Sequence, residues 1–176
     1  MTIVPTAYLG GISYFTKEVI YGTCILEGCE SFGKTSFRNR CTLRDINGRV
    51  IRLTIPVQRE GHKQETREVR ISYQAKWQSE HWHAIESCYG KKPYFLYYAD
   101  YLKPFYEQQF EYLWELNHGL TATIAGLIRN EPIRTIPPVQ MTENWAGQSW
   151  EKATWNNELS ILDILFEKGP EMVIVN

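Results

Sequence analysis

The clearest pattern in the chain is an alternation of apolar and polar residues in two neighbouring segments, 35–46 and 50–58. An Asn-Gly dipeptide stands between them, and between alternating runs it is a strong short-range signal for a β-hairpin. A two-residue turn would mix the apolar and polar faces, because a slip of one residue exchanges the faces of a strand. We therefore predict a three-residue turn with Gly48 in a bulge, in a register that pairs Leu43 with Leu53.

The remaining periodicity predicts short strands early in the chain and helices later. Residues 2–9 and 23–26 are strand-like, with helical spacing at 12–20 between them, which is the pattern of a β-α-β unit. A further strand is expected at 68–71. Helical spacing then recurs at about 74–89, 94–113 (bent at Pro104), 115–129 and 159–166.

This order predicts an α+β protein with a single domain over residues 1–176. The N-terminal β-α-β unit and the antiparallel hairpin are expected to form one small sheet, packed with three to four C-terminal helices. Residues 134–142, with two consecutive prolines, predict an extended connector. The tryptophan-rich segment 143–155 is interpreted as a lid or an interaction surface.

The helix predicted over residues 74–89 contains the sequence's most unusual cluster, AKWQSEHWHAIESCYG. Ser72 can cap its start, and Gly90 ends it. At about 100° per residue, one face collects Trp77, His81, Ala84, Ile85 and Cys88. His83 points the other way, so we expect His81 to be buried and His83 to be exposed.

This helix by itself cannot form a metal site or a thiol–imidazole pair. His81 and His83 are about 200° apart, and His81 and Cys88 lie roughly 10 Å apart along the axis. A buried imidazole nevertheless needs hydrogen-bond partners. Two interpretations stay open: a core histidine satisfied by backbone or a carboxylate, or a general acid/base lining a pocket and oriented by Asp163 of the closing helix.

The polar face of the predicted hairpin gathers four arginines, Arg38, Arg40, Arg44 and Arg52. Four guanidinium groups repel one another unless carboxylates or an anionic ligand come between them. A solvated face with salt bridges and an anion pocket are both consistent with this pattern. Asn39 is the converse case, a polar residue on the apolar face, and it is either a satisfied core amide or a contact to substrate.

Composition narrows the range of partners. The chain is 43% hydrophobic and has a formal net charge of −1, so no global field attracts nucleic acid or an anionic membrane. No window approaches the roughly 18 apolar residues that span a bilayer, and the first residues lack the features of a signal peptide. We expect a cytoplasmic protein with four reduced cysteines. The absence of C-x-x-C argues against a zinc site, and nothing indicates a cofactor. The oligomeric state is left open.

Several blocks, taken together and in order, resemble the WbqC-like protein family across almost the whole chain. They are PTAYLGGISYF, RNRC, LTIPV, W-x-x-x-H-W-x-A-I-E-S-x-Y-G-x-x-P-Y-F, PFYE and LSILDILFEKGP. The resemblance implies a cytoplasmic bacterial role in surface-polysaccharide (O-antigen-type) assembly, with amino-acid or acyl transfer as the suggested chemistry. The family-like polar residues are Tyr8, Tyr14, Asn39, Arg40, Trp77, His81, Tyr89 and Asp163. Thr6-Ala7 and Gly10-Gly11 depart from the family pattern.

Three functional hypotheses follow. The first is a transferase in which His81 acts as acid/base, Asp163 orients it, and Arg38 with Arg40 holds a carboxylate or phosphate. Asn39 and Tyr89 would position its small anionic substrate, and Tyr8, Tyr14 and Trp77 are also expected to bind it. The second is a non-catalytic small-molecule-binding or scaffold protein of a glycan pathway. The third is a cysteine-dependent acyltransferase or hydrolase, which needs Cys41 or Cys88 beside His81.

Overall fold

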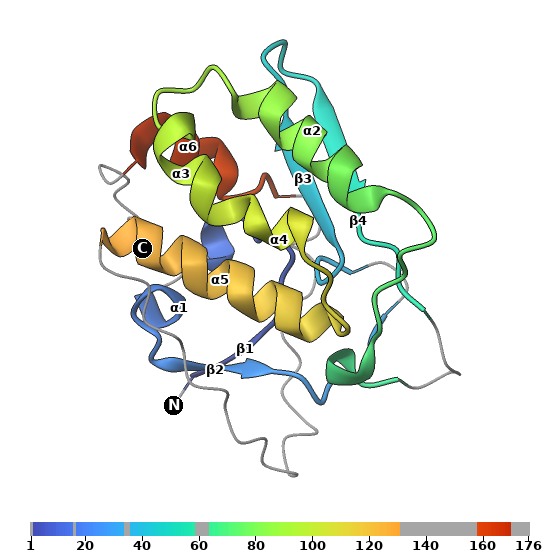
Figure 1. The fold of residues 1–176 in the computed structure, drawn as a ribbon. Coiled ribbons are helices and arrows are strands. Elements are labelled where there is room, and N and C mark those ends of the chain that lie inside the picture. Colours follow the sequence, from blue (N-terminus) through green and yellow to red (C-terminus); the bar gives the residue numbers. More distant parts are fainter. Residues whose placement is uncertain (1, 16, 34–35, 59–63, 131–157, 170–176) are drawn as a thin grey trace.

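The structure, a computed structural model, describes residues 2–15, 17–33, 36–58, 64–130 and 158–169 of the chain. It has an α+β fold, as the order of predicted elements indicates. The strands form two separate two-stranded sheets, β1–β2 and β3–β4, so the expectation of one small sheet is wrong. In the view of Figure 1, helix α5 runs between the β1–β2 pair and the hairpin that α2 covers.

The predicted N-terminal β-α-β unit is confirmed. Strand β1 (Thr2–Pro5) pairs in parallel with β2 (Cys24–Glu27). The connection holds a 3-10 helix, η1 (Ile12–Tyr14), and a short helix, α1 (Lys17–Tyr21), in place of the one continuous helix expected. Phe15 ends η1 with a ψ of 63°, which lies outside the helical region.

Strands β3 (Arg40–Arg44) and β4 (Val50–Thr54) form the antiparallel hairpin, and its predicted three-residue turn is present. The Asp45 N–H donates to the Arg49 carbonyl at 2.9 Å, so the three residues between them make the turn. Gly48 has a φ of +79°, the conformation that the glycine of such a turn adopts.

The predicted register of this hairpin is wrong by two residues. Leu43 pairs with Ile51, and Leu53 pairs with Cys41. A shift of two residues leaves each side chain on its predicted face, because strand side chains alternate with a period of two. The apolar pattern therefore fixed the faces of the hairpin but not the pairing along it.

The chain bends at residues 8–9, shortly after β1. Leu9 has a φ of +47°, a left-handed conformation that is uncommon for residues other than glycine. This segment reaches the hairpin through the Tyr8 N–H, which donates to the Phe37 carbonyl at 3.0 Å. Phe37 precedes β3, so this bond does not extend a ladder from one sheet to the other.

The helices follow the predicted order with shifted ends. They are η2 (Thr66–Glu68), α2 (Trp77–Tyr89), α3 (Phe95–Leu102), α4 (Pro104–Glu107), α5 (Leu113–Arg129) and α6 (Leu162–Lys168). The helix expected over 94–113 with a bend at Pro104 is divided there into α3 and α4, since proline has no N–H to continue α3. Its expected end at 113 is wrong, because α4 ends at Glu107. In place of the strand expected at 68–71, Ile71 and Arg70 form isolated bridges to Val57 and Tyr112.

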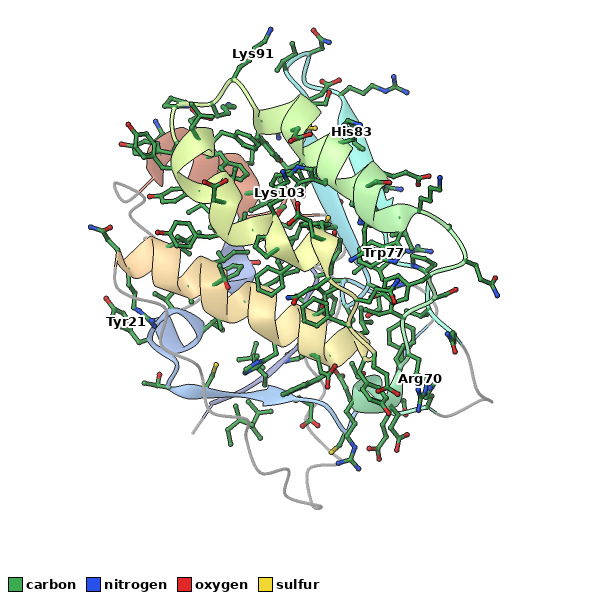
Figure 2. All side chains as sticks on the ribbon, in the orientation of Figure 1. Tyr21, Arg70, Trp77, His83, Lys91 and Lys103 are labelled. Carbon is green, nitrogen blue, oxygen red and sulfur yellow. The ribbon has the colours of Figure 1, made fainter. Side chains whose placement is uncertain are left out.

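Helix α2 buries the face that helical geometry predicts. Its buried residues are Trp77, His81, Ile85, Cys88 and Tyr89. The side chain of His83 is 86% exposed, and Figure 2 shows it on the outward side of the helix. The expected cap at Ser72 is wrong, because Lys76 precedes the first helical residue and the Ser72 N–H donates to the Pro56 carbonyl at 2.9 Å.

The segment before α6 ties the hairpin to the N-terminal loop. The Ser160 N–H donates to the Thr42 carbonyl at 2.8 Å. Glu158 accepts the Ser13 N–H at 3.0 Å, and its carboxylate occupies the space that a Cβ on Gly11 would need. A glycine at position 11 therefore allows this close approach.

Two expectations fall on residues that the structure does not describe. They are the extended connector at 134–142 and the tryptophan-rich segment 143–155. Within the described part of the chain, no helix combines the length and apolar character that crossing a membrane requires.

Candidate functional site

Three polar rings form a hydrogen-bonded chain inside the protein. The Tyr8 hydroxyl lies 2.8 Å from His81 Nδ1 and 3.0 Å from the Tyr106 hydroxyl. All three residues are buried, with exposures of 0% for Tyr8, 4% for His81 and 6% for Tyr106. We call these three residues the Tyr–His–Tyr network.

Each ring comes from a different element, so only the tertiary fold brings the network together. Tyr8 follows β1, His81 lies in the middle of α2, and Tyr106 belongs to α4. Trp77, one turn before His81, packs edge-on against the imidazole with ring centroids 5.2 Å apart. The backbone of Thr54, at the end of β4, also interacts with the His81 ring.

Burial keeps every member of the network neutral near pH 7. Burial lowers the pKa of His81 to about 4, and the Thr54 backbone opposes this shift only in part. Burial also raises the pKa of the Tyr8 and Tyr106 hydroxyls. A neutral imidazole has one N–H. When that N–H donates to the Thr54 carbonyl, Nδ1 accepts a hydrogen bond from the Tyr8 hydroxyl. The Tyr8 oxygen then accepts a hydrogen bond from the Tyr106 hydroxyl.

The hydrogen bonds and the pKa of His81 help to distinguish its two interpretations, a core histidine and a general acid/base. Its ring has partners in Tyr8 and the Thr54 backbone, which meets the hydrogen-bonding demand of a buried imidazole. A neutral ring with a low pKa has no proton to donate as an imidazolium at pH 7. The geometry favours a core histidine whose main partner is a tyrosine, a residue that the sequence interpretation did not consider for this role.

Tyr89 is the last residue of α2, and Asp163 belongs to α6. Burial raises the pKa of Tyr89 and of Cys88, and the Asp163 carboxylate contributes to both shifts. Position 89 is eight residues after His81, roughly 12 Å along a helix. The structure therefore places Asp163 near Tyr89 and Cys88. The hydrogen-bond partner of His81 Nδ1 is the Tyr8 hydroxyl rather than a carboxylate.

Asn39 directly precedes β3, and its side chain extends the pairing of the hairpin by one position. Its backbone N–H donates to the Ser36 carbonyl at 3.2 Å, so it is turned away from the neighbouring strand. The side-chain Nδ2 donates to the Ile55 carbonyl at 3.1 Å, and the Ile55 N–H donates to the Asn39 carbonyl at 2.8 Å. This amide replaces a missing strand bond, which accounts for a polar residue on the apolar face.

Arg38 points into the protein, away from the other arginines of the hairpin. It is only 5% exposed, and its guanidinium forms an ion pair with Glu30. Its Nη1 also donates to Ser36 Oγ at 2.8 Å. Burial raises the pKa of the Tyr14 hydroxyl, while its hydrogen bond with Thr121 and the nearby charge of Arg38 act in the opposite direction. Arg38 and Tyr14 are thus engaged in internal contacts.

Arg40, Arg44 and Arg52 lie together on the exposed face of the hairpin, which we call the arginine face. Thr42 stands directly opposite Arg52, so Arg52 is diagonal to both Arg40 and Arg44. Diagonal neighbours are about 7–8 Å apart, within reach of long side chains. Among the residues that the structure describes, none of the three arginines forms an ion pair.

Cys41 and Cys88 are free thiols, and both are buried. Burial raises the pKa of both thiols, and for Cys41 the nearby Cys88 adds to the effect. A thiol with a raised pKa stays protonated at neutral pH, whereas the thiolate is the nucleophile. This environment disfavours cysteine-dependent chemistry.

The described residues contain no cluster of three or more side chains able to hold a metal ion. They do contain a network member that sequence reasoning missed, Tyr106. It lies in the PFYE block of the sequence, but its partner Tyr8 is 98 residues away. Sequence periodicity does not connect residues so far apart. The one indication of Tyr106 in the sequence was its place in the PFYE block, which resembles the family pattern.

Comparisons with known proteins agree with the resemblance seen in the sequence. The profile of the WbqC-like protein family matches residues 6–137. The uncharacterised protein Rv1507c of Mycobacterium tuberculosis (strain ATCC 25618 / H37Rv) is 30% identical over 130 residues. That alignment covers 73% of this chain and 55% of the relative, so this chain spans about half of the relative's length. No solved structure matches the chain.

Proposed function

This chain belongs to the WbqC-like protein family, and from that premise we propose that it binds a small anionic molecule used in surface-polysaccharide assembly. A sugar phosphate, a nucleotide-sugar or an acyl donor would fit this class. The pathway rests on the family resemblance. The observation that carries the proposed binding is the arginine face, three exposed guanidinium groups without an ion-pair partner among the described residues.

The chemistry of the arginine face supports an anionic ligand. Guanidinium forks match the oxygens of carboxylates and phosphates in a bidentate geometry. Three like charges within reach of one another repel, and a bound anion relieves that repulsion. Since the formal net charge of the chain is −1, this attraction is a local property of the hairpin rather than of the whole protein.

The Tyr–His–Tyr network has a positioning role in this proposal. The Thr54 backbone interacts with His81, and Thr54 pairs with Arg40 across the hairpin. The buried network is therefore connected to the end of the hairpin that presents Arg40. His81 acts through this connection and does not touch the ligand.

Acyl or aminoacyl transfer is the second candidate function, and one observation favours it. The Trp77 Nε1 is buried beside His81 and has no hydrogen-bond partner among the described residues. A substrate oxygen bound there would accept from this N–H and would lie beside a neutral imidazole that has Tyr8 and the Thr54 backbone as partners. In this candidate Tyr8 orients His81 in place of Asp163, the residue that the sequence suggested for that role.

Calorimetric titration with inorganic pyrophosphate tests the binding proposal. Replacing Arg40 and Arg52 together with glutamine is expected to weaken binding by at least tenfold, about the effect of losing one charge-assisted hydrogen bond. Arg49→Gln is the matched control, because Arg49 is an exposed arginine in the same hairpin but outside the arginine face. Equal affinity in the double variant and the parent would exclude the arginine face as the binding element.

Mass spectrometry of reaction mixtures separates the two candidates. The parent protein is incubated with a nucleotide-sugar and an aminoacyl or acyl thioester, and the products are compared with those of His81→Gln. Transfer that depends on His81 in a folded variant supports the second candidate. Pyrophosphate binding without any transfer product supports the first alone.

A further inference from the structure

A surface pocket lies away from the arginine face, where three extended segments meet. It has a volume of about 390 Å³ and is lined by Gln58, Arg70, Ile71, Tyr73, Gln109, Phe110 and Glu111. Small-molecule sites occupy roughly 300–1,000 Å³, so its size suits a ligand of one ring. Figure 2 shows Arg70 beside η2 at the edge of the molecule.

Backbone hydrogen bonds fix the frame of this pocket. The Gln58 N–H donates to the Arg70 carbonyl at 2.8 Å, and the Ile71 N–H donates to the Glu111 carbonyl at 3.0 Å. The Tyr73 hydroxyl bonds to both backbone groups of Phe110, donating to its carbonyl at 3.0 Å and accepting its N–H at 2.8 Å. These hydrogen bonds hold the three segments together.

The charged groups of the pocket balance one another. Arg70 forms an ion pair with Glu111, and its guanidinium lies over the Tyr112 ring at 5.1 Å. The two paired side chains remain 42% and 55% exposed, so both are open to a ligand. An anion in this pocket would meet the Glu111 carboxylate, and a cation would meet Arg70. A ligand without net charge avoids both repulsions.

The uncharged lining supplies hydrogen bonds in both directions. Gln58 Nε2 reaches the Ile71 carbonyl at 3.3 Å, which leaves its side-chain oxygen able to accept from a ligand. Gln109 is an exposed residue of the lining, so its side-chain amide is accessible to a ligand. Amides, a carboxylate and a guanidinium are planar groups with paired donors or acceptors, and such groups match neighbouring hydroxyls on a ring.

Aromatic rings complete the lining. Phe105 stacks on Phe110 at 5.8 Å, with 11° between the ring planes, and covers one of its faces. Tyr73 contributes its ring, because its hydroxyl is occupied by the Phe110 backbone. Aromatic surface beside hydrogen-bonding groups suits a ligand with C–H bonds on one side and hydroxyls around its edge.

We propose that the pocket formed by Gln58, Arg70, Tyr73, Gln109, Phe110 and Glu111 binds an uncharged polyhydroxylated ring, a pyranose sugar. The aromatic rings contact the C–H face of the sugar. The amides, Glu111 and Arg70 bond to its hydroxyl groups without separating the Arg70–Glu111 pair. This site goes beyond the proposed function, since it uses none of the residues of the arginine face.

Nuclear magnetic resonance titration of the full chain tests this site. The probes are methyl α-D-glucopyranoside, methyl α-D-galactopyranoside and N-acetyl-D-glucosamine, each added to tens of millimolar. At least one sugar is expected to shift the amide signals of 58, 70–73 and 109–111 and to leave those of the arginine face unchanged. No shift at these positions with any of the three sugars overturns the proposal.

Variants of the pocket provide the second arm. Glu111→Gln and Gln109→Ala are each expected to lower the affinity for the sugar about fivefold to tenfold, the effect of one hydrogen bond. Gln74→Ala is the matched control, an exposed glutamine next to the pocket but not part of its lining. Unchanged affinity in both pocket variants overturns the assignment of the site.

Charged probes separate this inference from the proposed function. Glycine and inorganic pyrophosphate are titrated under the same conditions. If either of them shifts the pocket signals in place of the sugars, the inference is overturned: pyrophosphate would show that the pocket takes an anion, and the zwitterion glycine would show that it takes a ligand with separate charges rather than an uncharged sugar. Pyrophosphate shifting only the arginine face, with no response to sugars, would leave the proposed function intact and remove this inference alone.

Discussion

Polar residues have different roles on the inner and outer faces of the β3–β4 hairpin. On the inner side, Asn39 replaces a strand bond, and the Thr54 backbone interacts with the buried His81. On the outer side, Arg40, Arg44 and Arg52 have no ion-pair partner among the described residues. The side-chain N–H of Asn39 and the Thr54 backbone are engaged within the fold, whereas the outer charges remain available to a ligand.

Arg38 and Arg40 show that this difference between the inner and outer side can arise between residues that are close in the sequence. They are two residues apart, and a regular strand would place them on the same face. The bond from the Asn39 N–H to the Ser36 carbonyl turns the chain just before β3, and Arg38 enters the interior to pair with Glu30. Substitutions on the inner side should therefore affect stability, and those on the outer side should affect binding.

The largest effect is expected from Glu30→Ala. It removes the partner of the buried Arg38 and leaves that charge uncompensated, which destabilises proteins by about 3–5 kcal/mol. We expect a loss of about 3 kcal/mol, since Glu30 itself is 20% exposed. Urea unfolding measures it, with Glu68→Ala, an exposed carboxylate, as the control. Equal losses in the two variants would contradict a structural role for the Arg38–Glu30 pair.

The next effect is a loss of stability in mild acid caused by His81. Its folded pKa of about 4 lies below the ordinary histidine value of about 6.5, so protons bind the unfolded chain first. The stability is fully present above pH 6.5 and is lost as the pH falls towards 4. Linkage gives a loss of about 2 kcal/mol between pH 7 and pH 5.

His81→Gln should remove most of this pH dependence of the free energy of unfolding. His118 is the internal comparison, because burial also lowers its pKa. His118→Gln removes its own contribution and retains that of His81. An unchanged pH profile in the His81 variant would show that the ring is protonated equally in both states.

A smaller loss is expected from removing the central hydroxyl of the network. Tyr8→Phe leaves both His81 Nδ1 and the Tyr106 hydroxyl without a partner, whereas Tyr106→Phe removes only the end of the chain. We expect about 2 kcal/mol for the first and about 1 kcal/mol for the second from unfolding in urea. The reverse order would mean that Tyr106 and not Tyr8 is the centre of the network.

The smallest change in stability is expected on the outer face. Arg44→Gln and Arg52→Gln should each alter the free energy of unfolding by less than about 0.5 kcal/mol, because exposed side chains without partners contribute little. We expect any such change to be an increase in the free energy of unfolding, since each substitution removes a charge that its neighbours repel. A loss comparable to that of Tyr8→Phe would show that the outer arginines also support the fold.

The sequence determined the features that depend on local periodicity. The buried face of α2, the turn at Gly48 and the break at Pro104 all follow from spacing or from the backbone limits of one residue. Helical and strand periods place a side chain on a face without information about distant partners. For that reason the burial of His81 was predictable.

Tertiary structure alone decided how those faces are used. A shift of two residues preserves the alternation, so the hairpin register was not encoded in the pattern. The turn before β3 sent Arg38 inward, against the direction that the strand period predicts. Tyr106 reaches Tyr8 across 98 residues, and packing of α4 against the N-terminal segment, rather than any repeat in the sequence, makes it a partner of the network.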